Sequence, residues 1–525
     1  MSIAPPDNPG HWRPSHNRWA ITIVVTFAAF MEILDTTIVN VALPHIAGGL
    51  SASYDEATWT LTSYLVANGI VLTISGWLGA MLGRKRYFLI CLAMFTVWSF
   101  FCGTAASLAQ LVVFRVLQGF FGGGLQPTQQ AIILDIFPPE KRAAAFGVTA
   151  IATVVAPVLG PALGGYITDT YNWRWIFFIN LPVGIVAVYF ASILVEDPPW
   201  LRRQSRTIDF TGLFLIALGL GCLQIMLDRG EIEDWFGSRF IQIMAALAGA
   251  GIIGAIGWLL CARKPVVNLD VFKDWNFATG CIFISATGGT LYAGAVAIPQ
   301  FAQTVIGYTS TWAGFVMSPG AIAVILLIPI VGWLMKVLQT RFVIAAGFMF
   351  IGLAFFVSSR LLTPDIDFET LVAIRTAQTA GLAFLFVPIS TVAFATIPRE
   401  LNGDATALYT MLRNIFGSVG ISLASAAIIE RAQVHQAYLA QWATPMHQAF
   451  DELVAVYQRA LAAMGYAAGA THEMALGRAY QVYQRQAELL AYSDLFYYVA
   501  LVAFAVVPLC FLLSKVKGSG APVAH

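Results

Sequence analysis

Apolar residues occur along this chain in long runs that are separated by short polar connections. The hydrocarbon core of a bilayer is about 30 Å thick, so a helix that crosses it needs roughly 20 apolar residues. Runs of that length predict fourteen membrane-spanning helices and a fold that is all-α and integral to the lipid bilayer. They lie near residues 18–41, 57–80, 87–106, 108–132, 143–167, 174–194, 209–228, 239–261, 276–303, 312–335, 342–361, 371–396, 403–429 and 494–514.

Composition supports this prediction and excludes other classes of protein. Of the 525 residues, 58% are hydrophobic and 11% are charged, whereas ordinary soluble domains contain about 25% charged residues. A net charge of +1 provides no basic surface for nucleic acid. We find no phosphate loop, no metal-ligand spacing and no nucleophile with a matching base. We therefore expect no nucleic-acid partner, no metal, no cofactor and no enzyme activity.

Basic residues predict which ends of the helices are cytoplasmic. Cytoplasmic connections carry an excess of Lys and Arg, and long loops cross the membrane largely regardless of charge. We therefore expect both termini in the cytoplasm, the 430–493 connection outside, and a multi-pass protein of the cell inner (plasma) membrane. The basic residues that alternate in this way are Arg13, Arg18, Arg84, Lys85, Arg86, Lys141, Arg142, Arg202, Arg203, Arg206, Arg263, Lys264, Lys273, Lys336, Arg341, Arg399, Lys515 and Lys517. The first run is long enough to span, so we expect a retained helix and not a cleaved signal.

An internal repeat relates the two ends of the chain. "GWLGAMLGRKR" from Gly76 is echoed by "GWLMKVLQTRF" from Gly332, and Arg115 and Gln118 are echoed by Arg375 and Gln378. Transporters are commonly built from such repeats. We predict an N-terminal six-helix bundle (1–194), two extra helices with a linker (195–265), and a C-terminal six-helix bundle (266–525) that includes an extracytoplasmic helical loop (430–493).

Two carboxylates, Glu32 and Asp35, interrupt the first apolar run. A charged side chain at the centre of a spanning helix costs about 2.5–3.5 kcal/mol, so such residues face the bundle interior and pair with a partner. Both acids share a helical face with small residues, and Phe27 and Ile38 belong to the opposite, bulky face, which we expect to meet lipid. Arg115 on the fourth span is the expected partner, and together the three residues are the candidate proton-coupling site.

The alternative is a static ion pair that only locks the first and fourth spans together. Glu32 could also face a lipid headgroup or a hydroxyl group. In the second half, Thr287 and Thr290 occupy the positions that correspond to the two acids. We therefore expect proton handling in the first half and a more apolar wall in the second.

Candidate substrate-binding and gating residues follow from the same helices. A binding cavity between the halves near the midplane of the bilayer is expected to use Asn40, Gln118, Gln126, Tyr292 and Gln300. Small residues and prolines in the fifth span allow close contact and bending. We predict a gating role for Pro157, Gly160, Pro161 and Gly164, with ordinary close packing as the alternative.

These segments resemble the major facilitator superfamily and, within it, the fourteen-helix drug:proton antiporters of the EmrB/QacA type. The resemblance covers nearly the whole chain. The motifs that carry it are "LDTTIVNVALPHI" from Leu34, "GWLGAMLGRKR", the Arg115 and Gln118 pair, and "PVLGPALGGYITDTYNWRWIFFINLPVG" from Pro157. By this resemblance Gly76, Gly83, Arg84 and Lys85 form a gating loop motif, although Ala80, Met81 and Ala156 depart from the family pattern.

The resemblance implies a proton-coupled multidrug efflux antiporter that exports hydrophobic or amphipathic toxic compounds by alternating access. The tenth span has no acid of the QacA kind, which favours the EmrB side. A periplasmic membrane-fusion adaptor and an outer-membrane channel are implied partners. Two alternatives remain: a proton-coupled uptake symporter, which the fifth-span motif disfavours, and a receptor or scaffold that moves no solute.

The outer connection contains an amphipathic stretch. Apolar residues recur at helical spacing in "QAFDELVAVYQRALAAMG", at Phe450, Leu453, Val454, Tyr457, Leu461 and Met464. We expect a helix that either docks the adaptor or caps its own protein.

Overall fold

The computed structural model describes residues 14–199, 209–444 and 447–513. Among these residues every regular element is a helix, and fourteen helical segments are long and apolar enough to cross a membrane. The predictions of an all-α fold and of fourteen spans are confirmed. Six basic residues used to predict the topology lie outside the described residues: Arg13, Arg202, Arg203, Arg206, Lys515 and Lys517.

The first six spans are built from nine helical segments. They are α1 (Arg18–Gly49), α2 (Tyr54–Ala57), α3 (Trp59–Leu82), α4 (Arg84–Thr104), α5 (Leu108–Gly122), α6 (Leu125–Ile136), α7 (Pro139–Thr170), α8 (Trp175–Phe178) and α9 (Asn180–Leu194). The extra pair follows as α10 (Phe210–Arg229) and α11 (Arg239–Cys261). The last six spans are α12 (Trp275–Phe301), α13 (Ser310–Val337), α14 (Thr340–Leu361), α15 (Phe368–Ala393), α16 (Asn402–Ala440) and α18 (Ala468–Val506), with α17 (Gln448–Ala463) between the last two.

Several helices differ from their predicted bounds, and for two of them the reason lies in single residues. α1 continues to Gly49 with Pro44 inside it, because a proline removes one backbone donor without preventing the helix from resuming. The predicted fourth span is two helices, α5 and α6, which are joined at Gly123 and Gly124. A Cβ atom on Gly123 would lie 2.3 Å from the Asn68 carbonyl oxygen of α3. The glycines at this break therefore let the chain approach the neighbouring helix closely.

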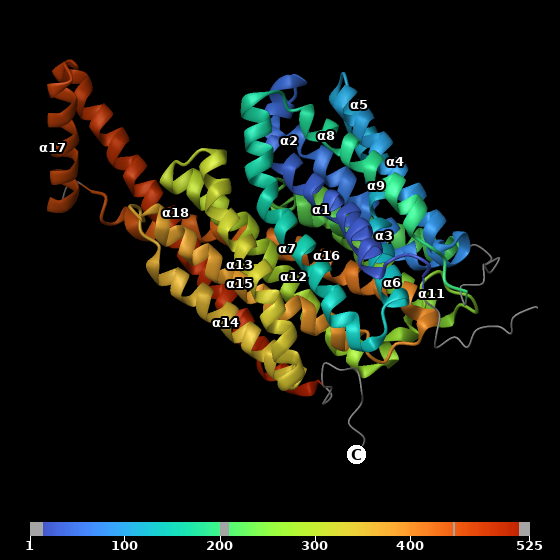
Figure 1. Cartoon of the computed structure of the whole chain (residues 1–525). Coiled ribbons are helices and arrows are strands. Elements are labelled where there is room, and N and C mark those ends of the chain that lie inside the picture. The colour runs from blue at the N-terminus through green and yellow to red at the C-terminus, as the bar shows by residue number, and fades with distance from the viewer. Residues whose placement is uncertain (1–13, 200–208, 445–446, 514–525) are drawn as a thin grey trace, which may run out of the picture.

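The predicted outer connection is largely helical. α16 and α18 extend beyond the bundle, and α17 folds back against α18, as Figure 1 shows at its upper left. We call the end of the molecule with the start of α1 and the end of α18 the termini end. The opposite end, with α2 and α17, is the hairpin end (Figure 1).

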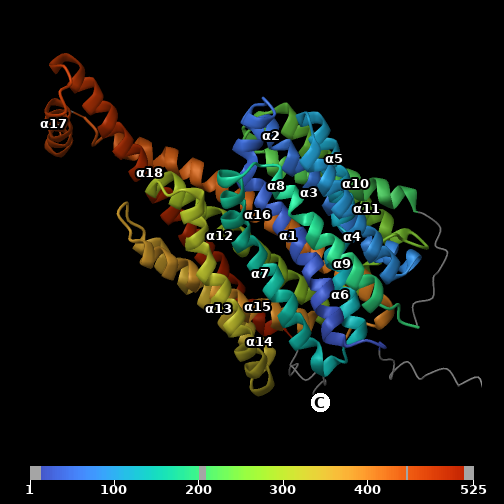
Figure 2. The same ribbon diagram turned by 45° about the horizontal axis from the view of Figure 1, so that its top comes forward.

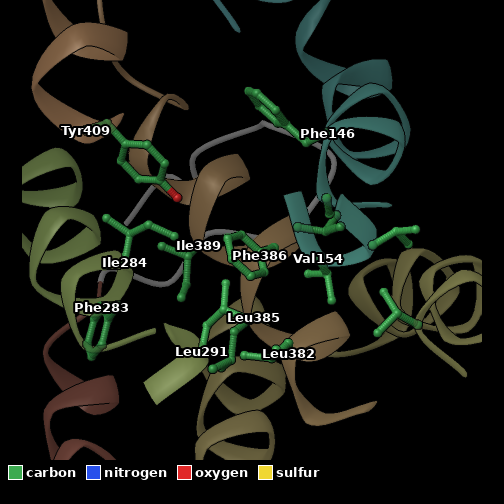
Figure 3. Packing of buried hydrophobic residues seen from close by; sticks show 14 of the residues in the cluster. Phe146, Val154, Phe283, Ile284, Leu291, Leu382, Leu385, Phe386, Ile389 and Tyr409 are labelled. Carbon is green, nitrogen blue, oxygen red and sulfur yellow. The ribbon is translucent and has the colours of Figure 1, made fainter. Parts of the chain in front are cut away.

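The two halves of the chain pack against each other through a few helix pairs. α7 lies along α13 and α15, and α3 lies along α16. Figure 3 shows Val154 of α7 beside Phe386 of α15, in an apolar core that α12, α15 and α16 share with α7. α10 and α11 form a pair at the edge of the molecule, and α10 contacts both α3 and α16 (Figure 2). The division at residues 194 and 266 agrees with this packing and stays a prediction.

Candidate transport site

Asp35 lies at the centre of a closed polar cluster. Its Oδ2 is 2.6 Å from Nη1 of Arg115, and neither side chain is exposed. Its Oδ1 accepts hydrogen bonds from Gln118 Nε2 at 3.1 Å and from Asn180 Nδ2 at 2.8 Å. Because both carboxylate oxygens are paired with donors from α5 and α9, the predicted contact between the first and fourth spans is present. Asp35 faces the bundle interior.

Ile38 shows that the bulky face of the first span is not wholly turned to lipid. Ile38 is 1% exposed, whereas Phe27 is 46% exposed. A Cβ atom on Gly164 of α7 would lie 3.1 Å from the Ile38 carbonyl oxygen. The expectation of a lipid-facing side is therefore wrong at Ile38, because α7 packs on that side of α1.

Glu32 has a different environment from Asp35. Its Oε1 accepts hydrogen bonds from the Tyr64 hydroxyl at 3.2 Å and from Asn68 Nδ2 at 2.9 Å, and its Oε2 accepts one from Gln126 Nε2. The ring of Tyr64 also lies below the Arg115 guanidinium, whose Cζ is 4.0 Å from the ring centroid. Tyr64 therefore contacts both the Glu32 carboxylate and the cation that pairs with Asp35.

Gln126 carries this network across to the second half of the chain. Its Oε1 accepts a hydrogen bond from Nη2 of Arg413 on α16. Arg413 also donates to the Oδ1 of Asn414, from Nε at 3.2 Å and from Nη2 at 3.1 Å. The result is a continuous path of hydrogen bonds from Glu32 through Gln126 to a buried arginine. The expectation of a more apolar wall in the second half is wrong at this position.

A cavity of about 120 Å³ lies where α1, α3, α6, α10, α12 and α16 meet. Glu32, Asn68 and Gln126 line it from the first half, and Tyr292, Asn414 and Ser418 line it from the second. One water needs about 10–15 Å³ of such space, whereas sites for drug-sized ligands have volumes of about 300–1,000 Å³. In this state the cavity has room for several waters and is smaller than a typical drug-binding site.

The structure brings some predicted substrate-binding residues together and not others. Gln126 and Tyr292 line the cavity. Gln118 belongs to the closed Asp35 cluster. Asn40 and Gln300 are exposed and do not line the cavity. Of the two predicted acids, Glu32 lines the cavity and Asp35 does not.

The second half lacks a counterpart of the Asp35 pair, as the repeat predicted. Thr287 and Thr290 are buried and donate to carbonyl groups of their own helix. Arg375 is 2% exposed and its Nη1 donates to Gln378 Oε1 at 3.5 Å. Its Nε and Nη2 have no hydrogen-bond partner among the described residues. The repeat therefore places an arginine at equivalent positions in both halves, but among the described residues only the arginine of the first half has a carboxylate partner.

The predicted gating residues of α7 pack against two helices. A Cβ atom on Gly160 would overlap Thr37 of α1, and one on Gly314 of α13 would lie 2.5 Å from the Ala162 Cα. Pro157 and Pro161 lie inside a helix that runs unbroken to Thr170. The small residues thus allow α7 to contact α1 on one side and the second half on the other.

The predicted loop motif lies where the halves meet at the termini end. A Cβ atom on Gly76 would lie 2.7 Å from backbone atoms of Gly403 on α16. Gly83 adopts φ +88° between α3 and α4, a conformation that favours glycine. The backbone N–H of Lys85 donates a hydrogen bond to Asp197 Oδ1 at 2.8 Å. The motif therefore joins a sharp turn to a close contact between the two halves.

Buried polar groups close the same end. Arg84 forms an ion pair with Asp135 of α6. Asn402 Nδ2 of α16 donates to Asp135 Oδ1 at 3.1 Å, and Arg142 Nη1 donates to the carbonyl oxygen of Phe394 at 3.0 Å. Despite the departures at Ala80 and Met81, the motif makes contacts across the two halves, and the structure represents a state closed at the termini end.

The sequence profile of the Major Facilitator Superfamily matches residues 25–421. The chain belongs to this superfamily. Multidrug export protein EmrB of Escherichia coli (strain K12) is 38% identical over 427 residues, which are 81% of this chain and 83% of that protein. Fatty acid resistance protein FarB of Neisseria gonorrhoeae is 34% identical, over 95% of this chain and 97% of that protein. The resemblance inferred from the motifs is confirmed, and the chain is a member of the EmrB family within the superfamily.

Other comparisons agree with this assignment. Colistin resistance protein EmrB of Acinetobacter baumannii (strain ATCC 17978) is 30% identical, over 96% of this chain and 98% of that protein. The crystal structure of peptide transporter POT in complex with sulfate is similar with a TM-score of 0.59, over 96% of this chain and 98% of that chain. Its sequence identity is 15%, so it shows the fold alone. The prediction of a major facilitator fold is confirmed.

Several residues of the site in this superfamily member were not predicted from its sequence. Asn180, Tyr64 and Asn68 bind the two acids, and Arg413 and Asp135 join the halves. Arg413 was detectable as a lone arginine within the 403–429 apolar run. The other four carried no comparable signal, because a single uncharged polar residue within a span, or an acid just beyond a span end, does not indicate which helix it will meet.

Proposed function

We propose that this chain exports hydrophobic and amphipathic toxic compounds in exchange for protons, by alternating access. It is a multidrug efflux transporter of the EmrB family, and the relatives named for multidrug export and colistin resistance support this reading. The single observation that carries the proton-coupling part is a carboxylate, Glu32, in the wall of a cavity shared by both halves. The names of these relatives also point to export, not to uptake.

Glu32 is the group that exchanges protons with cavity water in this proposal. Asp35 and Arg115 form the charged pair behind it, and Tyr64 connects the two sites. While Glu32 is ionised, its charge acts on Arg413 through the amide of Gln126. Protonation removes that charge and weakens the link between α1 and α16, since hydrogen bonds to ionised groups are about twice as strong as neutral ones. The two halves can then separate and exchange substrate.

The gating residues act at the two contacts between the halves. Gly76, Gly83, Arg84 and Lys85 hold the termini end closed in the state described here. The ridge of Pro157, Gly160, Pro161 and Gly164 serves as the surface on which α7 moves relative to α1 and α13. We place the termini end in the cytoplasm, so this state is closed to the cytoplasm.

We place this multi-pass membrane protein in the cell inner membrane, with both termini cytoplasmic. The predicted partnership with a periplasmic adaptor and an outer-membrane channel remains a proposal. The apolar side of α17 is occupied, because Val454 and Leu461 pack on Ala475 and Ala479 of α18. Of the predicted apolar positions only Met464 is strongly exposed, at 73%. An adaptor would therefore contact the outside of this helical pair and not the predicted apolar face.

Efflux of ethidium from proteoliposomes with an imposed pH gradient tests the proposal. We expect Glu32→Gln to abolish efflux driven by the gradient while the melting temperature in detergent stays close to that of the native protein. Asp35→Asn is expected to reduce both efflux and stability, because its two oxygens hold donors from two other helices. Unchanged efflux in Glu32→Gln would move the coupling site elsewhere.

The same assay separates the alternative functions. Ethidium that accumulates on the side toward which the protons flow would indicate a symporter, as expected for uptake. Native protein that moves no compound of the tested series, although it is folded, would favour a receptor or scaffold.

A further inference from the structure

The extra helix α10 presents polar side chains to both halves of the transporter. Its outer turns contain Gln224 and Asp228, which lie one turn apart on the same face. Gln224 lines the central cavity together with Glu32. Its Nε2 donates to Asp228 Oδ1 at 2.9 Å and to the hydroxyl of Ser418 on α16 at 3.1 Å. Asp228 is thus one hydrogen-bonded side chain away from the cavity.

Asp228 is held between the two halves. Thr62 of α3 lies beside its carboxylate, and the hydroxyl of Ser422 on α16 donates to the carbonyl oxygen of the preceding residue, Leu227, at 2.5 Å. The Oδ2 atom of Asp228 is buried and accepts no hydrogen bond of ordinary geometry among the described residues, although the Thr62 side chain lies within reach of the carboxylate. An ionised carboxylate with an unpaired buried oxygen is costly, and taking up a proton removes that cost.

The charged groups around Asp228 do not neutralise it. Its neighbour Arg229 is directed away, since Nη1 donates to the carbonyl oxygen of Asp55 at 2.8 Å and Nη2 pairs with Glu233 at 3.1 Å. The side chains that act on the Asp228 carboxylate are the neutral groups of Gln224 and Thr62. Tyr64 of α3 binds Glu32, and Arg413 of α16 binds Gln126 and Asn414. The other titratable or charged residues of the packed helices are Asp404, Tyr409, Glu430, Arg431, His435 and Tyr438 of α16, and Arg239 and Cys261 of α11.

A second acid continues the polar line toward the hairpin end. Glu231 follows the end of α10 and hydrogen-bonds with Ser425 of α16. Burial raises the pKa of the Glu231 carboxyl. Glu231 and Asp228 are therefore two proton-accepting groups toward the hairpin end of α10, and Gln224 separates Asp228 from the cavity.

We propose that Asp228 is a second proton-binding carboxylate, through which protons that enter from the hairpin end reach the cavity and Glu32. The proton binds to the carboxylate at Oδ2, is released to cavity water beside Gln224, and leaves Asp228 ionised again. This inference rests on the proposed proton coupling and adds an entry route to it. The route lies on a helix outside the internal repeat, which gives the extra pair a role beyond filling the edge of the molecule.

Proton titration of the full-length protein in detergent tests the inference without any substrate. Between pH 5 and 9 we expect Asp228→Asn and Asp228→Ser to bind about one proton fewer per chain than the native protein. Two variants are used because Asn and Ser both keep a polar group for Gln224, so a shared loss reflects the missing carboxyl. The matched control is Asp234→Asn on the turn after α10. Asp234 is exposed and lies outside the packed helices, so its replacement should leave the titration curve unchanged in this range.

The outcome for Asp228 can be separated from the outcome for the proposed function. Curves of both Asp228 variants that superimpose on the native curve would overturn the inference, because the carboxyl would then hold the same protonation state throughout. In proteoliposomes we expect Asp228→Asn to shift the dependence of ethidium efflux on the outer pH by at least about one unit. If native protein fails to couple ethidium efflux to protons, the proposed function fails, and the titration still decides whether Asp228 binds a proton.

Discussion

At the scale of single residues, two acids three positions apart in one helix have different surroundings. Asp35 is enclosed by donors from α5 and α9, whereas Glu32 lines a cavity of about 120 Å³ and is linked to the second half through Gln126. A group that exchanges protons during transport needs contact with water, and a group that fixes helices together does not. This difference supports the proposal that Glu32 exchanges protons and that Asp35 has a supporting electrostatic role.

Replacement of Arg115 tests this division of roles. Removing one partner of a buried ion pair costs about 3–5 kcal/mol, because the other charge remains buried without compensation. We therefore expect Arg115→Met to lower the melting temperature in detergent markedly. Arg360→Met, at an exposed arginine, is the control and should leave the melting temperature nearly unchanged. Equal stability of the two variants would show that Asp35 has enough partners without Arg115.

At the scale of helices, the repeat places the same residue type in unlike surroundings. Gly76 and Gly332 occupy equivalent positions in "GWLG" and "GWLM". A Cβ atom on Gly76 would meet the backbone of Gly403, whereas one on Gly332 would meet nothing within 4 Å. The close approach of α3 and α16 therefore requires a glycine in the first half only.

Alanine at each of these positions makes a matched pair of variants. We expect Gly76→Ala to force α3 and α16 apart and to shift the protein toward states that are open at the termini end. Distances between spin labels on the termini ends of α3 and α16 should then increase or broaden, whereas Gly332→Ala should keep the native distribution. A native distribution for Gly76→Ala would mean that the contact with Gly403 does not control closure.

At the scale of the whole molecule, the outer helical pair is a separate packing unit. Val454, Leu461, Ala475 and Ala479 form a small apolar cluster that is distinct from the main core of the bundle. Loss of this cluster should therefore leave the membrane-spanning part folded. The projecting position of α17 in Figures 1 and 2 agrees with this separation.

A charged residue within that cluster makes the separation measurable. Leu461→Asp buries a carboxylate without a partner, which is unfavourable, so we expect α17 to detach from α18. Limited proteolysis should cut between residues 441 and 467 faster than in the native protein, while the melting temperature of the bundle stays the same. Val456→Asp is the control on the same helix, since Val456 is 52% exposed. A lower melting temperature for Leu461→Asp would show that the outer pair stabilises the bundle.

The sequence by itself determined the number of spans, the superfamily and the Asp35 and Arg115 pair. A bilayer requires long apolar helices and makes an isolated charge costly, so span positions and the need for a partner are visible in local patterns. The cost of a charge in the bilayer also predicted that Glu32 faces the bundle interior. It could not show that Glu32 lines a cavity and Asp35 does not, because both lie on one face of the same helix.

Only the tertiary structure decided which helices meet and what closes each end. Arg413 reaches Gln126 from a helix far along the chain, and Asp135 meets both Arg84 and Asn402. α10 brings Asp228 between two helices from opposite halves. These contacts depend on the packing of distant segments, and a hydropathy pattern fixes the length and depth of a helix but not its neighbours.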